Sequence, residues 1–521
     1  MKKIYFIYLN LFLFLLFNSC DWLDLTPIDY FGSGSFWKSQ SQVEGYMLGI
    51  HDQLRNDYQS LYILGEARGG TSALGSNVLA ATNENTSPIK DNTFTKDAVG
   101  ITNWNGYYSR IMQVNLFISE VENGCEFLTD NDRKYFLGQA YGIRAHFYFM
   151  LYRTFGGVPI IKTVEVMKGG IEASKLYTPR ATPKEVMDFI KDDINISDQN
   201  FGSNFTIKGG KSMWSKAATL MLKANIYLWS AKVSTGDQTP SGTDLQTAKD
   251  ALTQLIGKFK LLPNFSDVFS ASNKGNEEII LVNHFAEGEA TNWGIRFVYW
   301  PLNFVNQMYG RNGELMPDTL DLRSTGAYNN TYKYELFESF DSNDLRRDAT
   351  FLDFYSKDYS GEIITKNLAL KKCLGEIDSN GNRIYVSDIV VYRYSEVLLL
   401  MAEIENKLGN DPSVYINEVR QRAYGTNYDV AIHGYTNQDF ASNELAILYE
   451  RDKEFVWEGK RWFDVCRMTD ATGRPLVFSS AASYGTDYPI LDYNTEAHKL
   501  LWPVDVNTLN GDPTLEQTPG Y

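Results

Sequence analysis

Two glutamates, Glu287 and Glu289, stand close to Trp293 and form the best candidate pair for acid–base chemistry on a glycosidic bond. Hydrolysis of such a bond needs two carboxyl groups roughly 5 to 9.5 Å apart. The chain has 64 acidic residues, so neighbouring acids are common, and a solvated loop explains this pair better. No Gly-rich phosphate loop, His-Glu-x-x-His or Gly-x-Ser-x-Gly motif is present. We therefore predict no catalytic residues and no enzyme, and a surface glycoside hydrolase remains the alternative.

Metal chemistry has equally little support in the sequence. The five histidines are scattered without ligand spacing. Asp378 and Asn380 resemble the oxygen-rich start of a calcium loop, but Ile389 stands where that loop would supply its bidentate glutamate. A hairpin turn between Leu374 and Tyr385 explains the segment better. No metal and no cofactor are predicted.

Aromatic and polar residues cluster over residues 292–311, outside any clear helical pattern. Sugars present flat C–H faces that pack on aromatic rings, while their hydroxyl groups need polar partners at the rim. The candidate stacking residues are Trp293, Trp300 and Tyr309. The candidate rim donors are Arg296 and Arg68, the latter in a first glycine-rich loop. For each ring taken alone, a place in the core beneath these loops explains the residue equally well.

The first residues have the pattern of an export signal. Lys2 and Lys3 precede an apolar run over residues 4–17, which is shorter than the roughly 20 residues that cross a bilayer. The run ends at Ser19-Cys20, a small residue followed by cysteine. We predict a lipoprotein signal peptide at residues 1–19 and lipid attachment at Cys20.

The composition excludes some functions. A net charge of −15 argues against nucleic acid, which needs clustered Lys and Arg. Aromatic residues make up 14% of the chain, and an acidic, tyrosine-rich exterior suits an uncharged ligand such as a sugar. The three remaining cysteines are odd in number and widely spaced, which indicates neither a disulfide framework nor a zinc site.

Helical patterns that must position these residues follow one another along the chain, joined by short loops. They predict an all-α fold of tetratricopeptide-like helix pairs. The helical scaffold is expected at about 36–270 and 390–468, with an irregular insert at about 274–388 that carries the ligand face. Thr182-Pro183-x-Glu185 has the order of a helix start: cap, proline, acid.

The segment 443–468 is the most unusual helical pattern. Its apolar residues return to one face, while alternating charges cover the other too densely for a simple solvent face. We expect one helix packed on two sides, with its charges paired to neighbouring segments. Gly459 lowers helix stability by roughly 1 kcal/mol relative to alanine, so we expect it where another helix approaches closely.

Several segments resemble the SusD/RagB family. Its C-terminal signature is similar to Glu450-Arg451, Glu454-Phe455, Glu458-Gly459, Arg461-Trp462, Asp464 and Arg467. Further similar segments run from Cys20 to the ending at Tyr521. The resemblance implies one domain over 20–521 and a lipid-anchored protein of the cell outer membrane that faces the exterior. It also implies an oligosaccharide ligand that is delivered to a SusC-like, TonB-dependent transporter. The resemblance places the glycine-rich loop that contains Arg68 and the segment 292–311 at the sugar site. A peptide-binding or glycoprotein-binding member of the same fold remains open.

Overall fold

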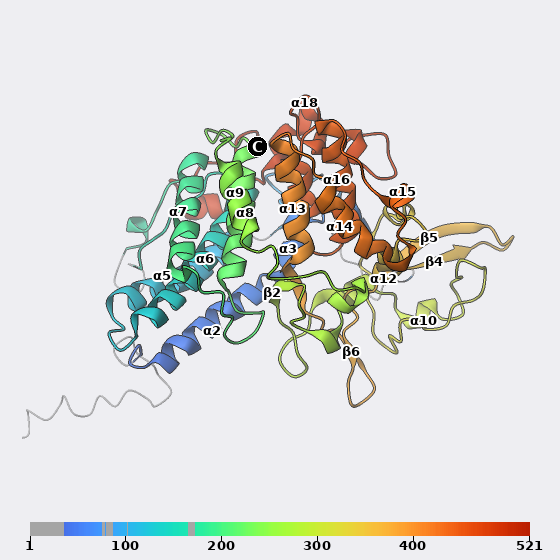
Figure 1. The fold of residues 1–521 in the computed structure, drawn as a ribbon, viewed down its shortest axis with the longest axis horizontal. Coiled ribbons are helices and arrows are strands. Elements are labelled where there is room, and N and C mark those ends of the chain that lie inside the picture. The colour runs from blue at the N-terminus through green and yellow to red at the C-terminus, as the bar shows by residue number, and fades with distance from the viewer. Residues whose placement is uncertain (1–35, 76–78, 80–86, 102, 165–171) are drawn as a thin grey trace, which may run out of the picture.

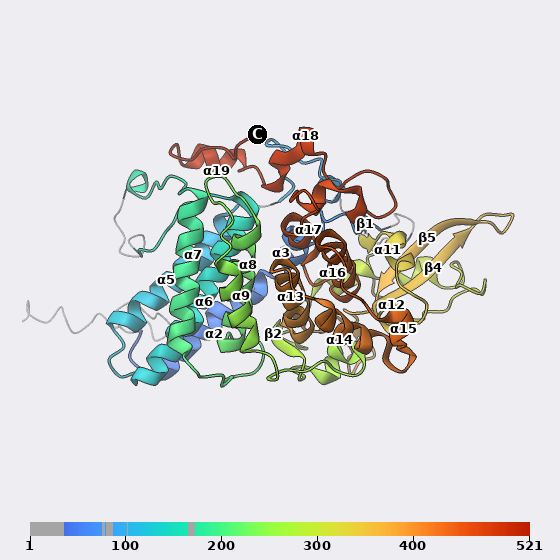
Figure 2. The same cartoon turned by 45° about the horizontal axis from the view of Figure 1, so that its top comes forward.

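The computed structural model describes residues 36–75, 79, 87–101, 103–164 and 172–521 (Figure 1). The predicted signal peptide at 1–19 and Cys20 lie outside the described residues. The fold is mainly helical, and two groups of helices lie side by side (Figure 2). In the described part of the chain, no helix combines the length and the apolar character needed to cross a membrane.

The first group contains helices that pack mainly against their neighbours in sequence. Local signals mark where these helices begin, as at α7. The Thr182 hydroxyl accepts from the backbone N–H of Glu185, the Glu185 carboxylate accepts from the backbone N–H of Thr182, and Pro183 occupies the first turn. This arrangement confirms the predicted helix start. The members are α2 (Gln40–Asn56), α3 (Tyr58–Gly65), α4 (Ser87–Lys90), α5 (Asn105–Asn123), α6 (Asp130–Phe155), α7 (Pro183–Phe201), α8 (Lys216–Lys232) and α9 (Asp244–Thr253).

The second group comes from the C-terminal part of the chain, and α13 packs on α9 of the first group. Its members are α13 (Tyr394–Lys407), α14 (Ser413–Tyr424), α15 (Val430–His433), α16 (Phe440–Glu454), α17 (Arg461–Arg467), α18 (Tyr493–Glu496) and α19 (Val506–Gly511). The prediction of one helix over 443–468 was wrong, because the chain turns between α16 and α17. Trp457 and Gly459 adopt the left-handed conformation there, at φ 66° and 70°.

Gly459 does serve a close approach, as expected. A Cβ atom at Gly459 would lie 2.3 Å from the carbonyl oxygen of Leu61 in α3. Gly65, at the end of α3, would meet the carbonyl oxygen of Gly459 at 2.1 Å in the same way. The two glycines let α3 and the turn before α17 touch backbone to backbone.

The insert carries strands, so the all-α prediction was too simple. Four two-stranded antiparallel sheets occur among the described residues. They are β1 (Ser72–Leu74) with β3 (Asn330–Tyr332), β2 (Ile279–Asn283) with β8 (Ile389–Arg393), β4 (Phe351–Lys357) with β5 (Ile363–Leu370), and β6 (Glu376–Ile377) with β7 (Arg383–Ile384). The last pair confirms the predicted hairpin at Asp378. The short helices here are α10 (Pro301–Phe304), α11 (Tyr334–Glu338) and α12 (Leu345–Thr350).

One large hydrophobic core runs through both helix groups, and a smaller core lies under the insert. The smaller core includes Tyr299, whose ring stacks on that of Phe304 at 3.5 Å. Cys125, Cys373 and Cys466 are free and buried.

A buried ion-pair network joins α16 to its surroundings. Arg393, at 0% exposure, contacts Glu278 at 2.8 Å, Glu454 at 2.5 Å and Glu458 at 2.8 Å. Arg346 reaches Glu454 at 2.9 Å from α12. Burial alone would raise the pKa of Glu454, but the surrounding guanidinium groups outweigh it and hold that pKa well below its usual range. The charges of the 443–468 segment are therefore paired with neighbouring segments, as predicted.

Arg461→Ala tests the importance of these pairs. The Arg461 guanidinium contacts Asp452 at 2.7 Å and donates to the Gly69 carbonyl at 3.0 Å, all in a buried position. Its loss leaves a buried carboxylate unpaired, so we expect the free energy of unfolding to fall by about 3–5 kcal/mol. Denaturant titration measures this, with Arg323→Ala at an exposed pair as the control. Equal midpoints for the two variants would contradict the expectation.

The buried acids also predict how stability depends on pH. Glu454 and Glu458 have lowered pKa values, burial being outweighed by Arg and Lys partners, so their stabilisation is lost as the pH falls below about 4. Burial raises the pKa of Asp57 to about 6 and that of Glu66 to about 7. Ionising these two groups therefore costs more in the folded state than in the unfolded state. Those two groups lower stability as the pH rises through the window from about 4 to 7. Denaturation midpoints from pH 3 to 8 should peak near about pH 5, and a monotonic rise would refute this.

Candidate functional site

The structure brings two of the predicted site residues together. Trp293 and Arg296 lie on the 3₁₀ helix Trp293–Phe297, which begins where the Asn292 side chain accepts from the Gly294 backbone. The Arg296 guanidinium lies 4.2 Å from the centre of the Trp293 ring. The ring of Tyr58 meets Trp293 edge-on at 6.3 Å. This patch is half-buried and combines an aromatic ring with a cationic donor.

Tyr309 belongs to a second aromatic group. Its backbone pairs with Tyr355 of β4, and the amino group of Lys357 lies 4.4 Å from its ring centre. The hydroxyl groups of Tyr355 and Tyr334 are 2.5 Å apart, and the Lys366 amino group lies 4.8 Å from the Tyr334 ring. We call Tyr309, Tyr334 and Tyr355 the tyrosine group. All of its members are half-buried.

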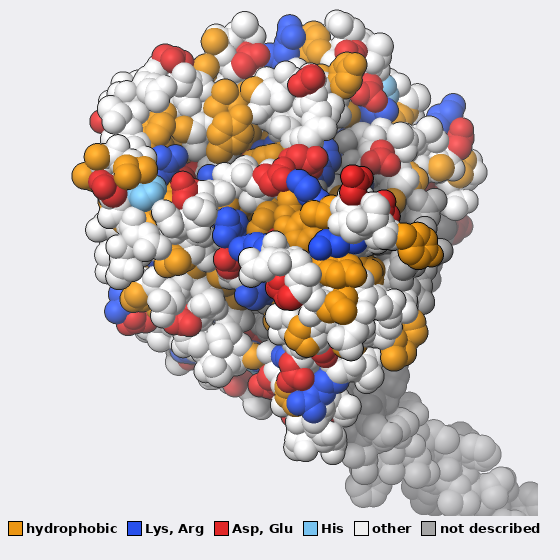
Figure 3. Space-filling model, turned by 90° about the vertical axis from the view of Figure 1, so that its right-hand side faces the viewer, with side chains coloured by type: hydrophobic (Ala, Val, Ile, Leu, Met, Phe, Trp, Pro, Cys, Tyr) orange, Lys and Arg blue, Asp and Glu red, His pale blue; other side chains and the backbone are white. Residues whose placement is uncertain are grey.

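Sequence reasoning missed Tyr334 and Tyr355. The bridge between Tyr309 and Tyr355 and the contact between the hydroxyls of Tyr334 and Tyr355 bring them together, and no local sequence pattern predicts either contact. On the side of the molecule where β4 and β5 project, hydrophobic side chains gather in a hollow bordered by acidic and basic groups (Figure 3).

Trp300 lies between these two groups in sequence. It precedes α10, is half-buried, and its backbone N–H donates to the Leu79 carbonyl at 3.4 Å. Its neighbour Tyr299 is completely buried, so the explanation of these rings as core residues holds for Tyr299.

Arg68 departs from its expected place. Its side chain is 0% exposed, and its guanidinium stacks 3.8 Å from the ring centre of Trp462. It donates to Asn92 at 2.8 Å and to the carbonyl of Lys499. Burial lowers its pKa to about 9. Arg68 therefore lies in the core and not at a ligand rim.

The glutamate pair considered for catalysis is exposed. Glu287 and Glu289 lie on the tight turn between Ala286 and Ala290, and Glu289 forms an ion pair with Arg55 of α2. An exposed turn lacks the apolar surroundings that prepare a carboxyl group as a general acid. Among the described residues, no group of three or more His, Cys, Asp or Glu could hold a metal ion.

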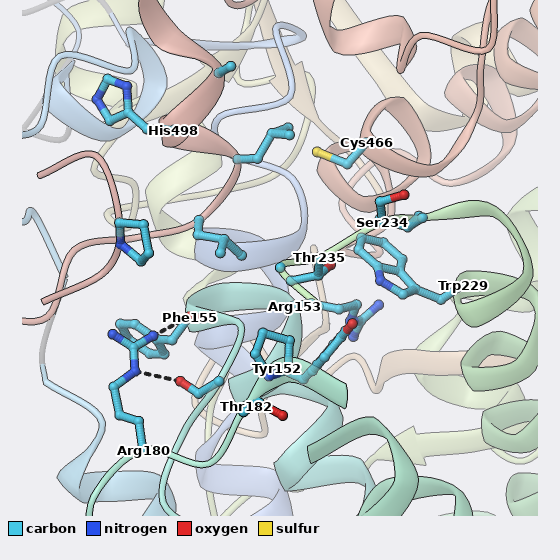
Figure 4. A pocket seen from close by; sticks show the side chains of 18 of the residues that line it. Tyr152, Arg153, Phe155, Arg180, Thr182, Trp229, Ser234, Thr235, Cys466 and His498 are labelled. Atoms are coloured by element: carbon cyan, nitrogen blue, oxygen red, sulfur yellow. Dashed lines mark hydrogen bonds between the residues drawn. The ribbon is translucent and has the colours of Figure 1, made fainter. Parts of the chain in front are cut away.

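A cavity of about 690 Å³ lies elsewhere (Figure 4). Its wall is formed by the ends of α6 and α8 and by the C-terminal segment, as residues from 152–157, 179–183, 229–236 and 462–519 line it. Arg180 holds one side by donating to the carbonyls of Phe155 at 2.5 Å and Gly157 at 2.7 Å. Sequence reasoning missed this cavity because nothing local shows that these segments meet.

Two sequence profiles match the chain. One, described as the SusD family, matches residues 365–521, and the other, described as starch-binding associating with outer membrane, matches residues 21–228. A solved SusD superfamily protein from Bacteroides fragilis is 40% identical, covers 93% of this chain and 100% of its own, and superposes with a TM-score of 0.87. The chain belongs to the SusD/RagB family.

Other relatives of this SusD-family protein are similar over nearly the whole chain, and the name of one states a binding role. B. fragilis NanU is 31% identical over 95% of this chain and 100% of its own, with a TM-score of 0.80. The starch-binding protein SusD of Bacteroides thetaiotaomicron is 25% identical over 96% of this chain and 95% of its own. The family consists of binding proteins that are not catalytic.

Arg68→Ala separates a core role from a ligand role. Removing the guanidinium leaves the Asn92 amide oxygen and the Lys499 carbonyl without a donor and deletes the stack on Trp462. We expect a loss of about 2–4 kcal/mol in the free energy of unfolding. The matched control is Arg296→Ala, at the half-buried aromatic patch, which should cost less than 1 kcal/mol. Denaturant titration of both variants checks this, and equal losses would disprove the distinction.

Proposed function

We propose that this SusD-family protein binds glycan oligosaccharides at the cell surface. In this proposal, Cys20 carries the lipid that anchors the protein to the outer membrane, and the bound sugar passes to a SusC-like, TonB-dependent transporter. Family membership supports the proposal, as do the starch-binding and outer-membrane descriptions of its relatives. A tetratricopeptide-like scaffold within one domain over 20–521 is part of the same proposal.

The tyrosine group is the observation that carries the binding role. Its rings are half-buried, so each is held by packing while part of its surface stays open to a ligand. The hydroxyl of Tyr355 also donates to Asp353 at 2.6 Å, and Arg311 pairs with that carboxylate at 2.7 Å. Fixed rings beside ordered polar groups suit a ligand with apolar C–H faces and many hydroxyls.

The patch of Trp293, Arg296 and Tyr58 is proposed as a second contact region, and Trp300 as a further stacking residue. A peptide ligand would also use aromatic rings, so the ligand screen must include peptides. Sugars are favoured because one relative is named a starch-binding protein and one matching family model is described as starch-binding associating with outer membrane.

Trp293→Ala and Tyr309→Ala test the proposed face. Loss of a stacked ring removes roughly 1–3 kcal/mol of binding energy, by analogy with stacked nucleic-acid bases. A glycan and peptide array should first identify a ligand of the wild-type protein. Calorimetric titration with that ligand should then show affinity lowered about 5-fold to 150-fold in each variant.

Tyr359→Ala is the matched control, because Tyr359 is fully exposed at the far end of the β4–β5 hairpin. Each variant must melt as the wild type does. Wild-type affinity in both Trp293→Ala and Tyr309→Ala would refute the proposed face. Peptides bound in place of glycans would refute the ligand class, and glycan products after prolonged incubation would favour the enzyme.

A further inference from the structure

The cavity near the C-terminus is lined by a cation that has no ion-pair partner among the described residues. Arg153 lines it from α6, with its guanidinium 3.6 Å from the ring centre of Phe463 and 4.1 Å from that of Phe149. Within the described ranges, no carboxylate lies at ion-pair distance from Arg153. The stack against two rings fixes the guanidinium plane without neutralising its charge.

The other cations of this wall are already satisfied. Lys232 pairs with Glu403 at 2.8 Å and Glu444 at 2.7 Å. Arg180 donates to backbone carbonyls and to Thr518. Glu396, which acts on Arg153 at longer range, is itself paired with Lys460 at 2.9 Å. Glu516 also lines the cavity, but no ion pair joins it to Arg153 among the described residues. Arg153 is therefore the cation of this wall that an entering anion could pair with.

Several hydrogen-bond donors in this wall also have no partner in the part of the chain that the structure describes. Nη2 of Arg153 reaches only the sulfur of Met150, at 2.8 Å, and its Nε is buried without a partner. The indole N–H of Trp229 and the hydroxyl of Thr469 are likewise unpartnered and buried. Unpaired buried donors are costly, and here they gather around one cavity.

Burial lowers the pKa of Arg153 to about 9, so the group remains charged at neutral pH. By its exposed surface Arg153 is only partly buried, so a ligand in the cavity can reach it. A partly buried cation without an ion-pair partner is unfavourable, and an anion that enters the cavity would relieve that cost. Charge-assisted bonds from a guanidinium favour a carboxylate, which accepts two parallel N–H bonds.

We propose that this cavity is a second binding site, distinct from the proposed glycan face, for a small sugar that bears a carboxylate. The carboxylate pairs with Arg153, as the site's otherwise uncompensated cation. The sugar body lies between aromatic side chains such as Trp229 and Phe155 and the hydroxyls of Thr182, Ser234 and Thr235, which Figure 4 shows around the same space. A volume of about 690 Å³ lies within the range of pockets that hold one small ligand.

Titration calorimetry with D-glucuronate, D-glucose and acetate tests the proposal on the purified protein. Glucuronate should bind at least tenfold more tightly than glucose, which lacks the charge, and than acetate, which lacks the ring. Arg153→Gln should weaken glucuronate binding at least tenfold. Equal binding of glucose or of acetate, failure of glucuronate to bind, or wild-type affinity in a folded Arg153→Gln variant would each overturn the proposal.

Two milder variants keep the test decisive if Arg153→Gln does not fold. Trp229→Phe removes the indole N–H together with its five-membered ring but keeps an aromatic ring, and Thr469→Val replaces only the hydroxyl with a methyl group. Each should weaken glucuronate binding at least threefold, and unchanged affinity in both would overturn the proposal. Trp293→Ala is the control for the other site: it should leave glucuronate binding unchanged, so that a failure here is separable from a failure of the glycan face.

Discussion

The buried contact between Arg393 and Glu454 is the interaction on which the arrangement of the molecule depends. Arg393 ends β8 and begins α13, while Glu454 ends α16. Glu278 and Arg346 join the same network from segments that belong to the insert. Buried ion pairs of this kind fix which partners can meet more than they add net stability. The network therefore fixes the position of the irregular insert relative to the helices. The loops proposed to bind the ligand are in this way held on a rigid scaffold.

A second junction brings the two ends of the chain together. The carboxylate of Glu66, just after α3, accepts from the backbone N–H groups of Trp457 and Gly459 and from the hydroxyl of Tyr332. One side chain thus joins the first helix group, the insert and the C-terminal helices. The close approach needs Gly459 on one side of the contact and Gly65 on the other. The same junction holds Arg68 against Trp462, which explains why that arginine is unavailable to a ligand.

Local signals allowed the sequence to predict what depends on near neighbours. The capped start at Thr182 and the hairpin at Asp378 are set by residues within a few positions. Gly459 signalled a close contact by its residue type alone, although its partner Leu61 lies far away in the sequence. The sequence did not predict the break between α16 and α17, because Trp457 adopts a positive φ that its residue type rarely adopts and that only tertiary contacts can enforce. The sequence did not predict the tyrosine group, because Tyr309 and Tyr355 meet through a backbone bridge between segments that are far apart in the sequence.

Net charge is a poor guide to the ligand of an enclosed site. The overall −15 favours an uncharged ligand at the exterior, where the whole charge distribution acts through solvent. Salt screens exposed charges beyond roughly 8 Å under physiological conditions, whereas buried charges are screened much less. Within the cavity, Lys232 is paired with Glu403 and Glu444, and among the described residues no carboxylate lies at ion-pair distance from Arg153. The electrostatic potential beside Arg153 therefore depends on these nearby groups rather than on the net charge of the chain. An acidic protein can therefore have an outer face that suits an uncharged ligand and a cavity that suits an anion, because the charges near each site determine what it binds.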